Sequence, residues 1–297
     1  MSGMMKNNTW ARTCFTICNS LFLGFLALIC LVPVINILSI SLSSSSAAGS
    51  GIVKLWPVDL TFQAYQFVTS KPEFMKAFAV SLMRLAVGVP FNMILTTLIA
   101  YPLSKENSQF RGRQVYVWFF VITMLFSGGL IPWYMTINGL GLIDNFLALI
   151  LPSAVSVFNV VILMNFFRQL PNEIMESAFI DGASHTRTLY QIVVPLSLPA
   201  IATLTLFCIV THWNAWFDGL LLMNSPDKYP LQSYLQTVII NRDMSLMSTS
   251  DLLTLAKVSN RTSKAAQTFV AAIPVLLVYP FLQKYFASGI IMGSVKG

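Results

Sequence analysis

Charged residues are scarce in this chain of 297 residues, since Asp, Glu, Lys and Arg together make up only 10% of it. A soluble domain carries about 25% of these four residues. Hydrophobic residues make up 56% of the sequence, and the mean hydropathy is +0.71. These values exclude an ordinary soluble domain and predict a polytopic membrane protein, whose core is helix packed on helix within lipid.

Cysteine and histidine are few, and neither is arranged for chemistry. The four cysteines are Cys14, Cys18, Cys30 and Cys208. All lie in or beside apolar segments without a CxxC pair, which is typical of small buried hydrophobic residues. The two histidines, His185 and His212, are not followed by another ligand at i+3 or i+4. The sequence therefore predicts neither a disulfide framework nor a metal site.

Motifs of catalysis and nucleotide binding are missing as well. The sequence has no GxxxxGK[ST] phosphate-binding loop, no HExxH and no GxSxG. We therefore expect no enzyme activity and no cofactor bound by this chain. The net charge is +7, but the basic residues are scattered in loops that flank apolar segments. That distribution is typical of a membrane protein and argues against nucleic acid as a partner.

Six apolar segments are long enough to cross a bilayer, which takes about 20 helical residues. They run over residues 15–40, 77–103, 115–135, 143–167, 196–223 and 268–290. Gly128, Gly129 and Pro132 predict that the third segment ends or bends near Ser127, and Pro152 predicts a kink in the fourth. We therefore expect an all-α protein with six transmembrane helices.

The connections between these segments differ in character. The Ser/Gly/Ala tract at residues 39–51 is typical of a flexible connection. The loop at residues 224–267 is long, and its helical patches at Leu231–Ile240 and Leu252–Val258 suggest a small external subdomain. No internal repeat and no separate soluble domain is visible. We therefore expect residues 1–297 to form a single transmembrane domain.

Charge in the short loops predicts the orientation. An even number of spans places both termini on one side, and the basic residues of all loops are nearly balanced between the two sides. The short loop at residues 104–114 carries three basic residues, whereas residues 127–142 carry none. Because short cytoplasmic loops are enriched in Lys and Arg, we expect both termini in the cytoplasm.

The segment at residues 173–195 is the longest polar island between two apolar segments in the second half of the chain. Glu173 and Glu176 lie near the start of an expected helix, where acidic residues suit the positive helix end. Asp181 and Gly182 then predict a break, because Gly accepts the left-handed conformation that reverses a chain. The sequence therefore predicts a helix–Gly–helix element that projects from the membrane towards a partner.

This element resembles the cytoplasmic motif EAA-x3-G-x9-I-x-L-P of the inner-membrane permeases of ABC importers. Here ESA at residues 176–178 is followed after three residues by Gly182, and after nine more by IVVP at residues 192–195. The chain departs from the motif at Ser177, where the family has Ala, and at Val194, where it has Leu. Both changes are conservative in size or polarity.

The resemblance implies the type I permease fold, with a coupling helix between spans four and five that docks into a groove on an ATP-hydrolysing subunit. It also implies alternating access and further partners: two ATP-binding subunits that hold ATP and Mg, a second homologous permease in a heterodimer, and an extracytoplasmic solute-binding protein. The residues that it assigns to ATPase coupling are Glu176, Ala178, Asp181, Gly182, Arg187, Ile192 and Pro195.

Aromatic and polar residues gather in the fifth segment, as THWNAWFD at residues 211–218. Trp rings can stack on the apolar face of a sugar, while amides and carboxylates bond its hydroxyls. The candidate substrate-path residues are Trp213, Asn214, Trp216 and Asp218. The alternative is an aromatic belt at the outer interface, with Asp218 reaching the headgroups. Arg84, in the second segment, has three options: an ion pair with Asp218, one with Asp144, or outward extension.

Two longer runs, at residues 126–154 and 213–236, resemble oligosaccharide permeases related to the maltose type. The resemblance thus implies a subunit that translocates an oligosaccharide across the bacterial cytoplasmic (inner) membrane. Basic residues in the external loops suit an acidic sugar, or equally the docking of a binding protein. The competing hypotheses are an importer for another solute and an ATP-independent secondary transporter, against which the missing internal repeat argues.

Overall fold

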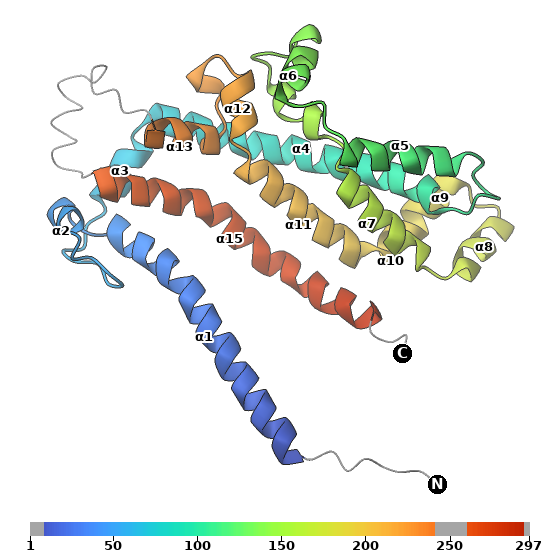
Figure 1. Ribbon diagram of the computed structural model, residues 1–297, viewed down its shortest axis with the longest axis horizontal. Coiled ribbons are helices and arrows are strands. Elements are labelled where there is room, and N and C mark those ends of the chain that lie inside the picture. Colours follow the sequence, from blue (N-terminus) through green and yellow to red (C-terminus); the bar gives the residue numbers. More distant parts are fainter. Residues whose placement is uncertain (1–8, 241–259, 294–297) are drawn as a thin grey trace. The chain divides into compact units, whose positions relative to one another are not determined.

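The computed structural model describes residues 9–240 and 260–293, and these residues form helices joined by short connections, with no strand among them (Figure 1). The expected all-α class is therefore confirmed. The chain divides into two units, which are described separately. The first comprises residues 1–71 and 243–271, and the second comprises residues 72–242 and 272–297.

The first unit contains α1 (Thr9–Ser41), α2 (Ser45–Ser50), α3 (Gln63–Thr69) and the first turns of α15 (Asn260–Gly293). The apolar window of α1 has no residue that the described part of the chain buries. A helix that is apolar on every side and uncovered by its own chain is typical of a membrane span. The small core of this unit lies where the end of α1 meets α2 and α15.

The tract at residues 39–51 is not the flexible connection that its composition predicts. Ser43 is buried, and its hydroxyl oxygen accepts a hydrogen bond from the backbone N–H of Val58 at 3.0 Å. Ser44 caps α2 by accepting from the N–H of Ala47 at 3.3 Å. Because these hydroxyls satisfy backbone groups, the small residues allow a close-packed turn instead of a solvated linker.

The second unit is built around α4 (Pro72–Ser104), which packs against α7 (Val157–Arg168) and α11 (Leu198–Asn214). These helices share the main core, whose most buried members are Ala100, Val160, Leu163, Phe167, Val193, Leu204 and Cys208. Figure 1 shows α12 and α13 near one end of α4, and α8 and α9 near the other. α4 therefore connects two groups of short helices.

The other elements of the second unit are short. In chain order they are α5 (Arg113–Leu125), α6 (Leu130–Gly139), η1 (Phe146–Leu149), η2 (Leu151–Ser153), α8 (Asn172–Ile180), α9 (His185–Thr188), η3 (Leu189–Val193), α10 (Val194–Leu196), α12 (Phe217–Leu222), η4 (Pro226–Lys228) and α13 (Leu231–Ile240). The expected helical patch at Leu231–Ile240 is confirmed by α13. The second patch, Leu252–Val258, lies outside the described residues.

Within the described ranges, two helices, α1 and α4, are by themselves long and apolar enough to cross a bilayer, and the count reaches five when each of three bent helix pairs is taken as one span. α15, with 34 residues, covers the sixth predicted segment. The third segment breaks between Leu125 and Leu130 with a bend of 115°, as its Gly-Gly-x-x-Pro sequence predicts. The break leaves α5 and α6 as two half-helices.

The fourth and fifth segments differ from their predictions. The fourth is no single helix kinked at Pro152, because the 3₁₀ turns η1 and η2 precede α7 at a bend of 48°. The fifth is divided after Asn214, and α12 starts at Phe217. The Trp216 carbonyl at this break accepts a hydrogen bond from Ser233 Oγ at 2.7 Å. A tertiary hydrogen bond thus satisfies a backbone carbonyl that the break leaves without a helical partner. Hydrophobic periodicity cannot reveal such a contact.

The sixth helix also starts earlier than predicted. α15 begins at Asn260, eight residues inside the loop expected at residues 224–267. Its first turns bury Thr262, Ser263 and Gln267. The polarity of these residues suggests an exposed loop, but in the structure they are helical and buried within the first unit.

Candidate functional site

The polar segment at residues 173–195 folds as the helix–Gly–helix element that its sequence predicts. α8 ends where Gly182 takes a φ of +80°, in the left-handed region that Gly accepts without strain. The N–H of Ala183 donates to the carbonyl of Ala178 at 2.9 Å, which closes the last turn of α8. Ser184 then caps α9 with its hydroxyl oxygen.

Most of the residues assigned to ATPase coupling lie on the outside of this element. Glu176, Asp181, Gly182, Arg187 and Pro195 are exposed, Ile192 is half-buried and Ala178 is buried. Ile174 and Ile180 are 40% and 85% exposed, so the apolar side of α8 is not covered by its own chain. A short helix with uncovered isoleucines is suited to a groove on another protein.

Lys105 joins this element to the end of α4, and sequence reasoning missed it. Its ammonium lies 4.6 Å from the ring centroid of Tyr101, 5.9 Å from that of Phe179 and 3.1 Å from Met175 Sδ. Burial lowers the pKa of the Lys105 ammonium, whose residue is only 8% exposed. The signal that could have found it is a Tyr–x–x–x–Lys pair where an apolar segment ends.

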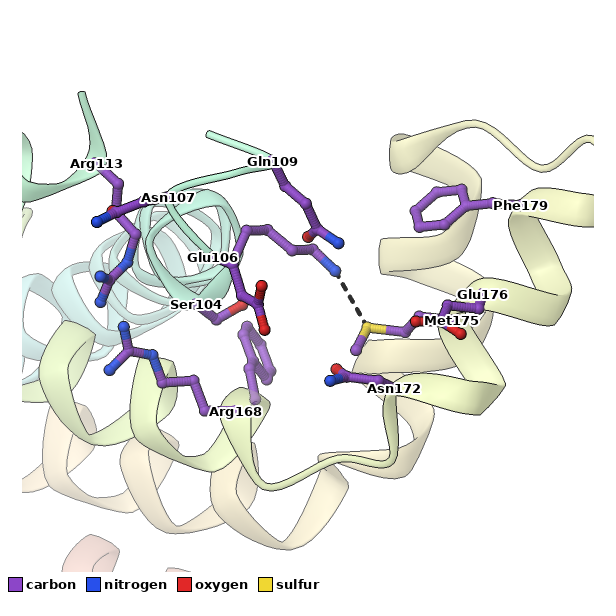
Figure 2. A pocket seen from close by; sticks show the side chains of 12 residues that line it. Ser104, Glu106, Asn107, Gln109, Arg113, Arg168, Asn172, Met175, Glu176 and Phe179 are labelled. Atoms are coloured by element: carbon purple, nitrogen blue, oxygen red, sulfur yellow. Dashed lines mark hydrogen bonds between the residues drawn. The ribbon is translucent and has the colours of Figure 1, made fainter. Parts of the chain in front are cut away.

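A polar cavity of about 490 Å³ lies behind α8, and Figure 2 shows the side chains that line it. Besides Lys105, its charged residues are Glu106, Arg113, Arg168 and Glu176. None of the three ion pairs found within residues 9–240 and 260–293 involves any of these five. The cavity therefore presents charges of both signs that its own chain has not paired.

A second cavity, of about 720 Å³, lies beside α4, α7 and α11 in the membrane-spanning part. Two buried amides meet there at Cys208: Asn159 Nδ2 donates to the sulfur at 3.3 Å, and the thiol donates to Asn92 Oδ1 at 3.4 Å. His212 also lines the cavity, and its Nδ1 has no hydrogen-bond partner among the described residues. Polar groups within a span are costly, which makes them candidates for function.

Aromatic and hydroxyl groups complete the lining of this cavity. Phe158 and Phe207 contribute to it and are 54% and 42% exposed, and Ser156 and Thr211 add hydroxyls. Aromatic faces combined with a few hydrogen-bonding groups suit the binding of a small polar ligand such as a sugar. The sequence did not reveal this cavity, because its residues come from three segments that are far apart in the chain.

The four predicted substrate-path residues do not share one surface. Trp213 is buried and packs edge-to-face on Phe78, with ring centroids 5.9 Å apart. Asp218 forms a two-pronged ion pair with the buried Arg84, whose Nη1 lies 3.2 Å from Asp218 Oδ1. Asn214 and Trp216 are exposed. The structure thus selects the first of the options for Arg84, and it uses Trp213 and Asp218 inside the protein.

All three ion pairs of the described residues attach the segment 218–228 to the rest of the second unit. Besides Arg84–Asp218, they are Lys76–Asp227 at 2.9 Å and Lys228–Asp144. Gly219 lies close against α13, where a Cβ atom would come within 2.1 Å of Ser233 Oγ. The segment 218–228 is therefore held in place at this end of α4.

A family model described as "Binding-protein-dependent transport system inner membrane component" matches residues 110–292 of this chain. Protein LplC of Bacillus subtilis is 40% identical over 291 residues, which cover 98% of each chain. The polygalacturonan/rhamnogalacturonan transport system permease protein YtcP of the same organism is 41% identical over 276 residues, covering 93% of this chain and 96% of that protein.

Among solved structures, a chain from a bacterial ABC transporter involved in the import of the acidic polysaccharide alginate is similar to this protein. It superposes with a TM-score of 0.84 at 35% identity, over 93% of this chain and 98% of the other. The similarity extends over both units and is not confined to the coupling element.

Proposed function

Since the chain belongs to the inner membrane components of binding-protein-dependent transport systems, we propose that it is the permease subunit of an ABC importer that carries an oligosaccharide across the bacterial cytoplasmic membrane. The names of its relatives support a sugar substrate. YtcP is named for polygalacturonan and rhamnogalacturonan, and the similar solved structure for the acidic polysaccharide alginate. These names favour an acidic oligosaccharide.

The chain needs partners for ATP-driven transport. Two ATP-binding subunits would hold ATP and Mg, and one of them would bind the exposed side of α8. A second homologous permease would complete the membrane core, and both termini of this chain would face the cytoplasm. A binding protein, as the family description states, would deliver the sugar at the end of α4 where the ion-paired segment 218–228 lies.

The cavity beside α4, α7 and α11 is the part of this chain that would face the sugar during alternating access. Its support is chemical: buried amides, hydroxyls and exposed phenyl rings line a space of about 720 Å³. Neither Lys nor Arg is found among the described residues that line this cavity. Selection for an acidic sugar would therefore rest on the binding protein, and the cavity would bind the hydroxyls and the apolar faces of the sugar rings.

The observation that carries this proposal is the exposed helix–Gly–helix element with the motif spacing of the family. Its test is Gly182→Trp. A Trp side chain would strain the left-handed turn and add bulk at the tip that must enter a groove. We expect the chain to insert into membranes at normal levels but to co-purify with far less ATPase and to lose sugar uptake.

Gly141→Trp is the matched control, because Gly141 has a φ of +68° and, like Gly182, has no atom within 4 Å of the place that a Cβ would take. It carries the same backbone strain outside the coupling element, so ATPase co-purification should stay normal. Normal ATPase binding and uptake by Gly182→Trp would show that the element does not couple the permease to an ATPase.

A further inference from the structure

We infer that Lys105 is a positioning residue that holds the coupling helix α8 to the end of α4, so that a displacement of α8 by the ATPase moves α4. This inference rests on the proposed function and goes beyond it, because Lys105 lies outside the coupling motif. The evidence is a cluster of five side chains from three helices: Tyr101, Lys105, Met175, Phe179 and His185.

The cluster has a simple geometry. Tyr101 lies in the last turn of α4, and Lys105 is the residue that directly follows this helix. Met175 and Phe179 are four residues apart on α8, so they lie on one face of that helix. The Lys105 ammonium lies 4.6 Å from the Tyr101 ring and 5.9 Å from the Phe179 ring. The ammonium also lies 3.1 Å from Met175 Sδ, and the dashed line that ends at Met175 in Figure 2 marks this contact.

His185 closes the cluster on the side of α9. Its ring centroid lies 4.8 Å from that of Phe179, and its Nδ1 lies 3.4 Å from the Tyr101 hydroxyl. The aromatic residues therefore connect α4, α8 and α9 on both sides of the Lys105 ammonium. Both halves of the helix–Gly–helix element are tied to the same end of α4.

The ammonium is held by rings and a thioether instead of a carboxylate. Glu106 and Glu176 line the same cavity, but neither forms an ion pair with Lys105. Attraction between a cation and an aromatic face strengthens when water is excluded, and Lys105 is only 8% exposed. Such a contact tolerates small rotations of the rings, so the contact between α8 and the end of α4 can persist while α8 moves.

Apart from this cluster, α8 is attached to the spans mainly through Met175, which also packs against the main core. Ala178 is its one buried residue, while Ile174, Glu176 and Ile180 are exposed. Met175 and Phe179 are the half-buried residues that face α4 through Lys105. Without the ammonium, α8 could move with the ATPase while α4 stayed behind.

The test compares Lys105→Met with Lys105→Arg in the complete transporter in proteoliposomes. Met keeps the length and the apolar stem but removes the charge, whereas Arg keeps a cation over the rings. We expect Lys105→Met to transport several-fold less sugar per ATP hydrolysed, with normal ATPase co-purification, and Lys105→Arg to restore most of the wild-type ratio. If Lys105 only filled space, Arg would not restore the ratio, because Arg fits the volume of the Lys side chain less well than Met does.

Lys71→Met is the matched control, because Lys71 also lies 4.6 Å from an aromatic centroid, that of Phe67, but in the first unit. Its sugar-to-ATP ratio should equal that of the wild type. Phe179→Leu supplies a second test: it should lower the ratio, and combining it with Lys105→Met should lower it no further, because both remove the same contact.

The inference is overturned if Lys105→Met keeps the wild-type ratio, if Lys105→Arg fails as Lys105→Met does, or if the two losses with Phe179→Leu are additive. These results differ from a failure of the proposed function. In that case the wild-type complex itself would show no ATP-driven sugar uptake, whichever residue stands at position 105.

Discussion

At the scale of single residues, Asp144 shows how one side chain can organise a connection. Its φ of +60° places it in the left-handed region, and its N–H donates to the carbonyl of Leu222 at 2.8 Å. Its carboxylate accepts from the N–H of Asn224 at 3.0 Å and from the ammonium of Lys228. These contacts offset the strain of a backbone conformation that non-Gly residues seldom adopt.

The same contacts predict a pH dependence. The hydrogen bond from Lys228, and after it that from Asn224, lowers the pKa of Asp144. A carboxylate with a lowered pKa stabilises the fold above its unfolded pKa of about 3.9, and this contribution is lost as the pH falls through the folded-state value. We therefore expect Asp144→Asn to melt below the wild type at pH 5–8.

Melting of the purified complex between pH 3 and pH 8 checks this expectation. The difference between the wild type and Asp144→Asn should be constant at neutral pH and should shrink as the pH falls below about 4, because the unfolded state then takes up the proton before the folded state does. A difference that persists unchanged at pH 3 would mean that the Asn side chain disturbs the turn for a reason other than charge.

At the scale of elements, the ion pair between Arg84 and Asp218 fixes α12 to α4. The Arg84 side chain is 2% exposed and that of Asp218 is 20% exposed, so the pair is shielded from water. Asp218 also accepts from the N–H of Gly219 at 2.9 Å. Asp218 thus attaches α12 to α4, and its predicted place in the substrate path stays a prediction.

A pair of variants separates these two roles. Asp218→Ala leaves the buried Arg84 charge without a partner, which costs about 3–5 kcal/mol of stability in buried pairs. Replacing both members with apolar residues of similar volume, as in Arg84→Met/Asp218→Leu, is often close to neutral. We expect the single variant to melt lower and to transport poorly, and the double variant to recover both properties.

Thermal melting and sugar uptake measured on the same preparations check this prediction. A double variant that recovers its melting temperature but still fails to transport would support the predicted place of Asp218 in the substrate path. Arg84→Met alone is a useful companion, because it leaves the partly exposed Asp218 unpaired and should destabilise less than Asp218→Ala.

Local chemistry made part of this architecture predictable from sequence. Gly128 and Gly129 weaken a helix, and Pro132 lacks the N–H that a continuous helix would bond to the preceding turn, so together they predict the break in the third span. Gly182 likewise predicts the turn after α8. The division of the fifth span could not be predicted, because it depends on Ser233, which satisfies the Trp216 carbonyl from 17 residues further along the chain. Contacts between distant segments also hid the cavity at Cys208 and the cluster at Lys105.

At the scale of the whole molecule, α4 connects the features that transport requires. Arg84 and Asn92 lie along it, at the attachment of α12 and at the membrane cavity, and Lys105 directly follows its last residue, at the coupling element. With a rise of 1.5 Å per residue, the first and last are roughly 30 Å apart. A helix that contacts all three places can relate a movement at one end to the shape of the cavity between them.

The cavity itself is testable through one hydroxyl. Thr211→Val keeps the shape of the side chain but removes a hydrogen bond to a sugar, which is worth about 0.5–1.5 kcal/mol. We therefore expect the KM for the sugar-loaded binding protein, measured from the rate of sugar uptake, to stay near the wild-type value. The amount of sugar taken up per ATP hydrolysed at saturation should fall by roughly 2–10-fold. Docking depends on the outer surface, which this variant leaves intact.

Thr205→Val on the same helix is the control, because Thr205 donates to the carbonyl of Ile201 in its own helix and does not line the cavity. It should transport as the wild type does. If Thr211→Val and Thr205→Val are both normal, the sugar passes along a different face of α11. If both are equally impaired, the loss reflects the packing of this helix, and the polar lining of the cavity has no special part in translocation.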